Sequence, residues 1–467
     1  MQKFFTFIFF ILIFQSSVKA EEYTNNTFKY GVASGDPLID KVIIWTKVES
    51  NEEISNLNYE VSKDENFKNI TNSGIINTNK DKDYTIKVDV DHLKPNTKYY
   101  YRFRYNNIYS PIGTTKTLPV NPRKFKIAFV SCQNYSDGYF SAYKHIIDDK
   151  PDLIVMLGDF IYENARNRPT RIDPSGNAYD LATYRKKYQV YLQEPFLRQA
   201  MNKIPMVSIW DDHEVQNDYS GLQMLKENPE RLKAAYTTFF NYVPIREQQG
   251  FKIYRTVKIG DLLELFMIDG RQYRDGNICH DLLKVDFDCT KKAHLASRTY
   301  LGKEQKNWLT NTLIDSKAKW KVIGNNTDIT EFSYFGNLFN FDQWDGFYSE
   351  KQDILKVISE KVNNAVFFTG DLHTFVQADV KYNHKKVSEE FTVTSISSRS
   401  LGIFYWFSNL VPLLIPEIKY FNPSKRGYIL AEFGTRKIEI NFFGVDRVDQ
   451  PLSKKLLLRH TDLIRKN

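Results

Sequence analysis

The sequence predicts an α+β or α/β protein in two parts, an all-β module over residues 21–120 and a larger layered domain over residues 121–467. In the first part, runs such as KVIIWTKV and KYYYRFRY alternate apolar and polar residues between turns rich in Asn, Gly and Pro. In the second part, continuous apolar runs such as FKIAFVS and DLIVMLGD are separated by helical stretches. Because strands without alternation are buried on both faces, this pattern indicates an α/β or α/β/β/α arrangement.

The first part has the pattern of a β-sandwich. Its segment LKPNTKYYYRFRY places a turn before a Tyr-rich strand, as at the tyrosine corner of an immunoglobulin-like or fibronectin-like sandwich. Pro119 and Pro122 follow in TLPVNPRKF, as in a linker between domains. We therefore expect the domain boundary near residue 120.

Residues 1–20 predict a signal peptide. A lysine precedes an unbroken apolar run from Phe4 to Phe14, and Val18 and Ala20 stand at the −3 and −1 positions of a cleavage site. The run is short for a membrane span, although an uncleaved anchor remains the alternative. We expect a secreted or periplasmic protein.

A second apolar segment spans residues 401–416. It contains Pro412 and Pro416, which disfavour a continuous membrane-spanning helix. We expect a hydrophobic insertion or a lid facing the substrate, able to touch a membrane surface transiently.

Net charge and cysteine content limit the kinds of ligand and the compartment that we expect for this protein. The 467 residues carry a net charge of +8, but the lysines are scattered, which favours acidic substrates or anionic lipids over specific nucleic-acid recognition. Of the three cysteines, Cys279 and Cys289 lie close together in a polar segment and can close a disulfide loop in an oxidising compartment. That pairing leaves Cys132, which must be either buried or bound to a ligand.

Polar side chains with ligand chemistry follow six of the predicted buried strands. Ligand-binding groups in α/β sheets gather at the carboxyl ends of the strands, so we expect these side chains to converge. Several close carboxylates cannot all ionise without a compensating cation, which predicts a cluster of bound metal ions. The residues at these strand ends are Cys132, Asp159, Asp211, Asp212, His213, Asp269, Asn325, Asn326, Asp371 and His373.

The thiol of Cys132 has two interpretations. Taken alone, it fits a small buried hydrophobe. Beside the carboxylates of GDFIY, DDHE and GDLH, a thiolate requires a cation to hold it. Tyr162, three residues after Asp159, can add a phenolate. A thiolate and a phenolate favour Fe(3+) at one position, whereas oxygen ligands elsewhere favour Ca(2+), Mg(2+) or Mn(2+).

Nine segments between Tyr30 and Tyr428 resemble the alkaline phosphatase D (PhoD-like) family of metallophosphoesterases. The resemblance implies an N-terminal β-sandwich followed by a calcineurin-like four-layer metallophosphoesterase domain. It also implies phosphomonoesterase or phosphodiesterase activity with one iron and two calcium ions. In chain order, the segments are YGVASGDPLIDKVIIWTKV, SCQNYSDGYFSAYKHI, DLIVMLGDFIYE, WDDHEVQNDYSG, IDGRQYRD, LGKEQKNWL, DQWDGFY, FFTGDLHT and KRGY.

The resemblance also implies roles for individual residues. Cys132, Asp159 and Tyr162 match the family's iron-side thiolate, bridging carboxylate and phenolate. Asp371 and His373 match its C-terminal metal-binding motif. The full set of expected metal ligands is Cys132, Asp159, Tyr162, Asp211, Asp212, Asn217, Asp371 and His373.

The central motif WDDHEVQND supplies further expectations. Asp212 stands where many metallophosphoesterases place an amide ligand, and Asn217 falls where the family has an amide close to the metals. His213 is expected to act near the leaving group. The expected catalytic residues are His213, Asp212 and Arg271.

Two pairs of residues have open roles. Arg271 and Arg274 in DGRQYRD are candidates to clamp the phosphate or to order the loop, and Arg271 is equally a candidate to pair with Asp269. Asn325 and Asn326 stand where relatives often carry paired glutamines, and this departure leaves their role open.

The expected reaction is attack of a metal-bound hydroxide on phosphorus, with the charge on the leaving oxygen met by a metal or by a proton from His213. The substrate is either a small phosphate ester or a phospholipid, cleaved in the second case in the manner of a phospholipase D; the apolar segment 401–416 motivates the lipid. A non-catalytic binding protein on a phosphoesterase scaffold is the alternative from another class. We expect a monomer.

Overall fold

The computed structural model describes residues 26–467, with the exception of 168, 280–286, 296, 335–336, 339, 401–407, 409 and 467. The predicted signal peptide at 1–20 and most of the apolar segment 401–416 therefore lie outside the described residues. Within the described part of the chain, no helix is long and apolar enough to cross a lipid bilayer.

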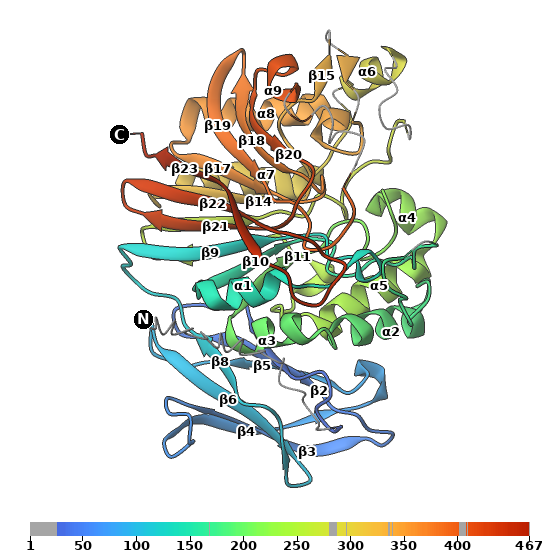
Figure 1. Ribbon diagram of the computed structural model, residues 1–467, viewed down its shortest axis with the longest axis vertical. Coiled ribbons are helices and arrows are strands. Elements are labelled where there is room, and N and C mark those ends of the chain that lie inside the picture. The colour runs from blue at the N-terminus through green and yellow to red at the C-terminus, as the bar shows by residue number, and fades with distance from the viewer. Residues whose placement is uncertain are drawn as a thin grey trace, which may run out of the picture.

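A nine-stranded sheet forms the centre of the molecule (Figure 1). Its strands β9, β10 and β11 are parallel neighbours. The β10 segment LIVML is buried throughout, which agrees with the expectation that unalternating strands are covered on both faces. In sheet order the strands are β23 (Lys455–Ile464), β22 (Lys437–Val445), β21 (Arg426–Gly434), β9 (Lys124–Val130), β10 (Leu153–Leu157), β11 (Met206–Ile209), β1 (Val32–Gly35), β2 (Val42–Lys47) and β5 (Thr85–Val90).

A seven-stranded sheet packs against the first one. The ring of Phe129 in β9 stacks on that of Phe368 in β17 with the centroids 3.8 Å apart, and residues of both sheets share one hydrophobic core. Its strands, in sheet order, are β12 (Arg255–Ile259), β13 (Leu263–Met267), β14 (Trp320–Asn325), β17 (Ala365–Thr369), β19 (Lys385–Thr392), β18 (Phe375–Tyr382) and β20 (Ile418–Asn422).

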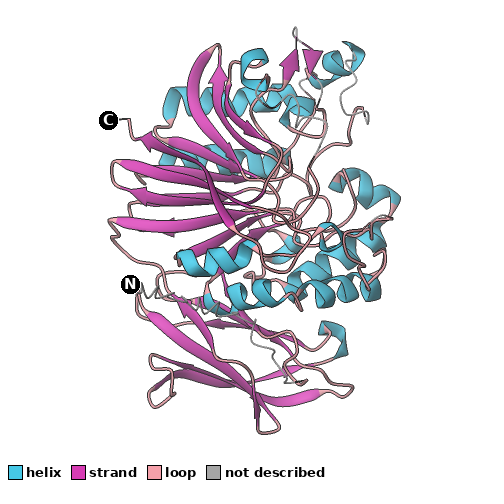
Figure 2. Ribbon diagram, in the orientation of Figure 1, coloured by secondary structure: helices cyan, strands magenta, loops and turns pink. Residues whose placement is uncertain are grey.

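Helices cover the outer faces of both sheets (Figure 2). On the nine-stranded sheet these are α1 (Ala142–Asp149), α2 (Leu181–Tyr191), α3 (Pro195–Lys203) and α5 (Pro229–Tyr242). On the seven-stranded sheet they are α7 (Gly302–Asp315) and α8 (Tyr348–Lys361). Capping residues fix the N-termini of two of these helices. Asp180 and Thr183 form a capping box at α2, and Asn228 caps α5 just before its proline. The shorter elements are η1 (Lys80–Lys82), η2 (Tyr135–Asp137), η3 (Gln249–Phe251), η4 (Trp344–Phe347), α4 (Gly221–Glu227), α6 (Phe287–Ala293), α9 (Val411–Leu414), β15 (Ser333–Tyr334) and β16 (Asn337–Leu338).

The N-terminal strands form a second layer under the large sheet. The order is β4 (Ile70–Thr78), β3 (Ile54–Ser62), β6 (Lys98–Tyr105) and β7 (Ile108–Tyr109), with β8 (Gly113–Lys116) also paired to β6. They share a core with β1, β2 and β5. The hydroxyl of Tyr99 accepts a hydrogen bond from the backbone N–H of Lys94 at 2.8 Å, the contact of a tyrosine corner. An immunoglobulin-like or fibronectin-like strand topology stays a prediction.

The N-terminal strands are also continuous with the rest of the molecule. Gly35 of β1 pairs in parallel with Met206 of β11, so β1, β2 and β5 extend the nine-stranded sheet. The expectation of a self-contained N-terminal module did not include this pairing.

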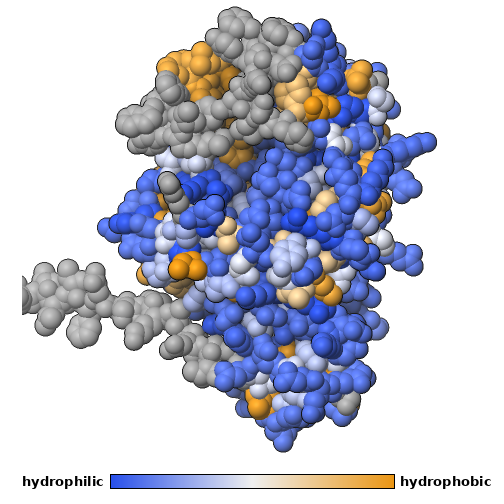
Figure 3. Space-filling view, turned by 90° about the vertical axis from the view of Figure 1, so that its right-hand side faces the viewer, coloured by the Kyte–Doolittle hydropathy of each residue, from blue (hydrophilic) through white to orange (hydrophobic). Residues whose placement is uncertain are grey.

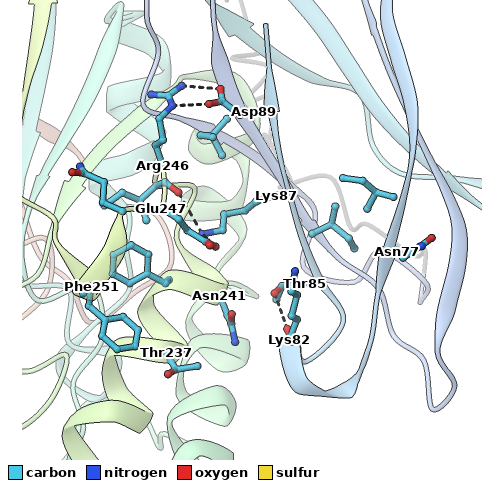
Figure 4. A pocket seen from close by; sticks show the side chains of 17 residues that line it. Asn77, Lys82, Thr85, Lys87, Asp89, Thr237, Asn241, Arg246, Glu247 and Phe251 are labelled. Carbon is cyan, nitrogen blue, oxygen red and sulfur yellow. Dashed lines mark hydrogen bonds and ion pairs between the residues drawn. The ribbon is translucent and has the colours of Figure 1, made fainter.

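A cavity of about 610 Å³ lies where β2 and β5 face α5 and η3 (Figure 4). Two ion pairs occupy its wall, Lys87 with Glu247 at 2.7 Å and Arg246 with Asp89 at 2.8 Å. None of the described residues that line it is a predicted metal ligand, so the predicted chemistry lies elsewhere.

Candidate metal centre

The ends of β9, β10, β11 and β17 bring the predicted ligands together. The loops that follow the strands gather at one end of the sheets (Figure 2). Three groups of ligand atoms each lie within 4.8 Å of one another, and Asp159 and Asp212 each belong to two groups, so the groups form a chain of adjoining sites. The groups are Cys132 with Asp159 and His373, Asp159 with Asp212 and His213, and Asp211 with Asp212 and Asp371.

The backbone at these positions has an uncommon conformation. Cys132, Asp159, Asp371 and His373 have φ values of 55°, 57°, 64° and 53°, in the left-handed region that residues with a Cβ seldom adopt. Such conformations cost roughly 1–3 kcal/mol each and concentrate at functional sites. Gly158 has a φ of 112°, and a Cβ there would lie 2.4 Å from the Asp211 Cβ, so only glycine allows the ends of β10 and β11 to approach.

Each of three carboxylates has one oxygen that accepts a hydrogen bond within the protein and one that accepts none. Asp159 Oδ1 accepts from the His213 backbone at 3.2 Å, Asp212 Oδ2 from the Asp218 backbone at 2.6 Å, and Asp211 Oδ1 from Arg271 at 2.5 Å. The second oxygens, Asp159 Oδ2, Asp211 Oδ2 and Asp212 Oδ1, are buried and accept no hydrogen bond from any described residue. Unpaired buried carboxylate oxygens are strongly unfavourable, and a bound cation satisfies them. The donor set therefore fits metal ions.

The pKa values of these groups also indicate a site for cations. Burial raises the pKa of Asp159 and of Asp211 well above the usual range, and neighbouring carboxylates raise them further. Burial and the Asp212 carboxylate raise the pKa of Asp371 to about 7. Burial together with Asp159 raises the pKa of the Cys132 thiol. The metal-free cluster would hold protons that cations displace on binding.

His373 and Tyr162 complete the end of the cluster near Cys132. The Nδ1–H of His373 donates to the Arg399 carbonyl at 2.7 Å, which leaves Nε2 to act as a ligand. That Nε2 lies 2.9 Å from the Tyr162 hydroxyl. Burial and Asp159 raise the pKa of Tyr162, so a phenolate requires a cation beside it.

His213 is held by an acid that the sequence reasoning did not select. Its Nδ1 lies 2.6 Å from the fully buried Glu163 carboxylate, and its ring packs 4.0 Å from that of Tyr162. Burial lowers the pKa of His213, but Asp212, Glu163 and Asp159 outweigh it and raise the pKa well above the usual value. In the metal-free protein these three acids therefore favour the protonated form of His213.

Glu214 is a second acid without a predicted role. Its carboxylate accepts three backbone N–H groups, from Asp159 at 3.1 Å, Phe160 at 2.6 Å and Asp211 at 2.9 Å. It thereby ties the ends of β10 and β11 together. Its place in DDHE was the available signal, since an acid two residues after paired aspartates shares their turn.

Arg271 has different partners from those expected. Its guanidinium is fully buried and lies 2.5 Å from Asp211 and 2.9 Å from Asp342. Asp269 is not its ionic partner, because that carboxylate accepts from the Arg271 backbone N–H and the Trp210 indole instead. Arg271 braces the carboxylates from behind and lies away from solvent, which disfavours the expected contact with substrate.

Asn217, Asn325 and Asn326 have partners other than the described ligand groups. Asn217 is exposed, and its backbone N–H donates to Glu163. The Asn326 amide bonds the backbones of Gly270 and Trp210, and the Asn325 amide bonds the Thr327 backbone and the Trp344 indole. The two buried asparagines are therefore occupied by structural contacts.

The predicted disulfide is present between Cys279 and Cys289. Cys132 is the remaining free thiol and is buried. A disulfide fits an extracellular compartment.

Two packed sheets that concentrate acids and imidazoles at one edge define the class of the metallophosphoesterases. The sequence models described as PhoD-like phosphatase and as PhoD-like phosphatase, N-terminal domain, match residues 127–442 and 15–119. The chain belongs to the PhoD-like phosphatase family and is a hydrolase of phosphoric esters.

Two individual relatives are similar to this chain, and the first of them agrees with this assignment. Alkaline phosphatase D of Bacillus subtilis (strain 168) is 32% identical over 447 residues, covering 88% of this chain and 76% of the relative. Purple acid phosphatase 23 of Arabidopsis thaliana is 24% identical over 144 residues, covering 28% of this chain and 31% of that protein.

Solved structures give the same answer for the fold. A structure of PhoD superposes with a TM-score of 0.87 at 30% identity, covering 95% of this chain and 91% of that one. The purple acid phosphatase PPD1 from yellow lupin seeds shares the fold with a TM-score of 0.61 at 13% identity, covering 93% and 74%.

Proposed function

We propose that this protein is an exported metal-dependent phosphoesterase that hydrolyses phosphomonoesters, phosphodiesters or both. The observation that carries the proposal is the set of three buried carboxylate oxygens, on Asp159, Asp211 and Asp212, that accept no hydrogen bond from any described residue. Cys132, Asp159, Tyr162 and His373 would hold Fe(3+). The remaining carboxylates would hold Ca(2+), with Mg(2+) or Mn(2+) as alternatives. The disulfide and the predicted signal peptide support export.

The cations and the side chains have separate roles in the proposed reaction. Bound cations would neutralise charge on the phosphate oxygens and lower the pKa of a water molecule. His213, charged and oriented by Glu163, donates a proton to the leaving oxygen. Asp212 stays ionised, because His213 and Arg271 outweigh the effect of burial and lower its pKa. Arg271 keeps Asp211 in place through its buried ion pair.

Hydrolysis of 4-nitrophenyl phosphate and bis(4-nitrophenyl) phosphate tests the proposal. We expect chelation to abolish turnover, and iron together with calcium to restore it. Asp159→Asn should lose both metal and activity, whereas the matched change Asp261→Asn, at an exposed aspartate paired with Lys319, should keep both. Full turnover by chelated, metal-free protein would contradict the proposal.

A phospholipid is the second candidate substrate, cleaved in the manner of a phospholipase D. The supporting observation is α9, where Leu413 is 76% exposed and Leu414 60% exposed. The face shown in Figure 3 is largely hydrophilic, and hydrophobic residues gather near its upper end. Phosphatidylcholine vesicles test this candidate, since absence of turnover with vesicles alongside turnover of bis(4-nitrophenyl) phosphate removes it.

A further inference from the structure

Two exposed arginines share one buried aspartate beside the metal centre. Arg166 Nε and Arg399 Nε lie 3.2 Å and 3.4 Å from the same oxygen, Oδ1 of Asp137. The Asp137 side chain is fully buried, whereas those of Arg166 and Arg399 are 41% and 49% exposed. The anchor is therefore inside the protein and the cations face solvent.

The pair lies next to the end of the cluster that contains Cys132. The Arg399 carbonyl accepts the hydrogen bond of His373, and the hydroxyl of the preceding residue, Ser398, donates to the Cys132 carbonyl at 2.8 Å. Arg166 follows, by three positions, Glu163, which holds His213. The two arginines thus approach the site from two separate loops.

The loop before Arg399 is fixed to the loop after Cys132. Ser397 Oγ donates to the Asn134 carbonyl at 2.8 Å, and the Asn134 N–H donates to Ser398 Oγ at 3.0 Å. The Arg399 N–H donates to Asp137 Oδ2 at 2.9 Å. These contacts hold the Arg399 backbone in place before any ligand arrives, which reduces the entropy lost on binding.

Among the described residues of this cluster, three guanidinium groups surround one carboxylate, that of Asp137. Arg426 is a third arginine close by; its Nε donates to the Ser398 carbonyl at 2.7 Å, and Asp137 and Arg399 both act electrostatically on it. Asp137 thus faces three guanidinium groups with one carboxylate. Glu163, the acid between Tyr162 and Arg166, is already bonded to His213. A surplus of fixed guanidinium charge attracts anions and binds phosphate or carboxylate groups in a bidentate manner.

We propose that Arg166 and Arg399 form a second anion-binding subsite, which recognises a further phosphate or carboxylate group on the organic part of the ester. The reacting phosphate lies at the metal centre, and the second anionic group lies on the guanidinium pair. This inference rests on the proposed function. It makes the enzyme selective for esters with two anionic groups.

Matched ligands test the subsite. In 3-phosphonopropionate a carboxylate replaces the methyl group of propylphosphonate, and in ethane-1,2-diyl bisphosphonate a second phosphonate replaces that carboxylate. Each is titrated calorimetrically into metal-loaded protein and assayed as a competitive inhibitor of bis(4-nitrophenyl) phosphate hydrolysis, at constant free metal. We expect a ligand with two anionic groups to bind about tenfold more tightly than propylphosphonate, as one charge-assisted contact provides. Comparison of the two ligands that have two anionic groups distinguishes a carboxylate from a phosphate as the preferred second group.

The quantity to follow is the ratio of the affinity for a ligand with two anionic groups to the affinity for propylphosphonate. The variants Arg166→Gln and Arg399→Gln should each reduce this ratio, and the double variant should bring it close to one. Each single variant leaves Asp137 one of the two arginines, so both are expected to fold. Arg104→Gln, the same change on β6 of the N-terminal strands, should keep the ratio.

Two results would overturn the subsite: an unchanged ratio in the double variant, or an equal loss of affinity for all three ligands. The second result would assign the arginines to the reacting phosphate. If the wild-type protein shows the ratio in calorimetry but hydrolyses no ester, the subsite is supported and the proposed function fails.

Discussion

Replacing Arg271 by methionine tests whether this residue is a buried brace. The change removes a fully buried cation from Asp211 and Asp342, which lie 2.5 Å and 2.9 Å away. Loss of one partner of a buried ion pair costs about 3–5 kcal/mol. Arg274 remains 2.5 Å from Asp342, so we place the loss near the lower end of that range, about 3 kcal/mol of the free energy of unfolding.

The assay is urea unfolding of metal-free protein at pH 7, followed by tryptophan fluorescence. Arg447→Met is the matched control; its partner Asp449 is 45% exposed and its own side chain 57% exposed, so we expect no measurable change. An Arg271→Met protein that unfolds at the wild-type urea concentration, while KM alone rises, would refute the brace. It would restore Arg271 as a contact of the substrate.

Three further predictions concern protonation and the N-terminal strands. The pKa of Asp371 in the folded metal-free protein is about 7, above its unfolded value, so its contribution to stability is present at acid pH and is lost between about pH 4 and 7. Urea midpoints of metal-free protein should fall across that window, less steeply for Asp371→Asn, and equal slopes would contradict this. Glu163→Gln removes one of the three carboxylates, beside Asp212 and Asp159, that raise the pKa of His213, so the alkaline limb of the kcat profile should move to lower pH; lower activity with an unmoved limb would indicate a structural role alone. Tyr99→Phe leaves the Lys94 N–H without its acceptor and should cost about 1 kcal/mol in urea unfolding, whereas an unchanged midpoint would remove the tyrosine corner as a stabilising contact.

The layers of the fold could be predicted because they follow from local patterns. The LIVML run of β10 is buried on both faces, and an apolar run of that kind has few other places in a fold. The parallel pairing of Gly35 with Met206 could not be predicted. The two segments are far apart in the chain, and no sequence pattern in either segment identifies the other as its partner.

The metal ligands that directly follow a strand could be predicted from the sequence. Asp159 and Asp371 follow apolar runs and therefore had to reach the same edge of the packed sheets. Glu163 and Asp137 were missed because their roles depend on contacts between residues that no sequence pattern links. Glu163 contacts His213, and Asp137 contacts two arginines. Pairing of Arg271 with its neighbour Asp269 was one of two expectations, whereas its partner Asp342 comes from a loop distant in sequence.

Metal content measured together with the visible spectrum tests the central claim that these side chains hold cations. We predict that the purified protein contains iron and calcium and is coloured, that Tyr162→Phe bleaches the colour, and that Cys132→Ala loses iron. A protein that hydrolyses phosphoric esters while containing no metal, and that takes up none when iron and calcium are supplied, would contradict the account.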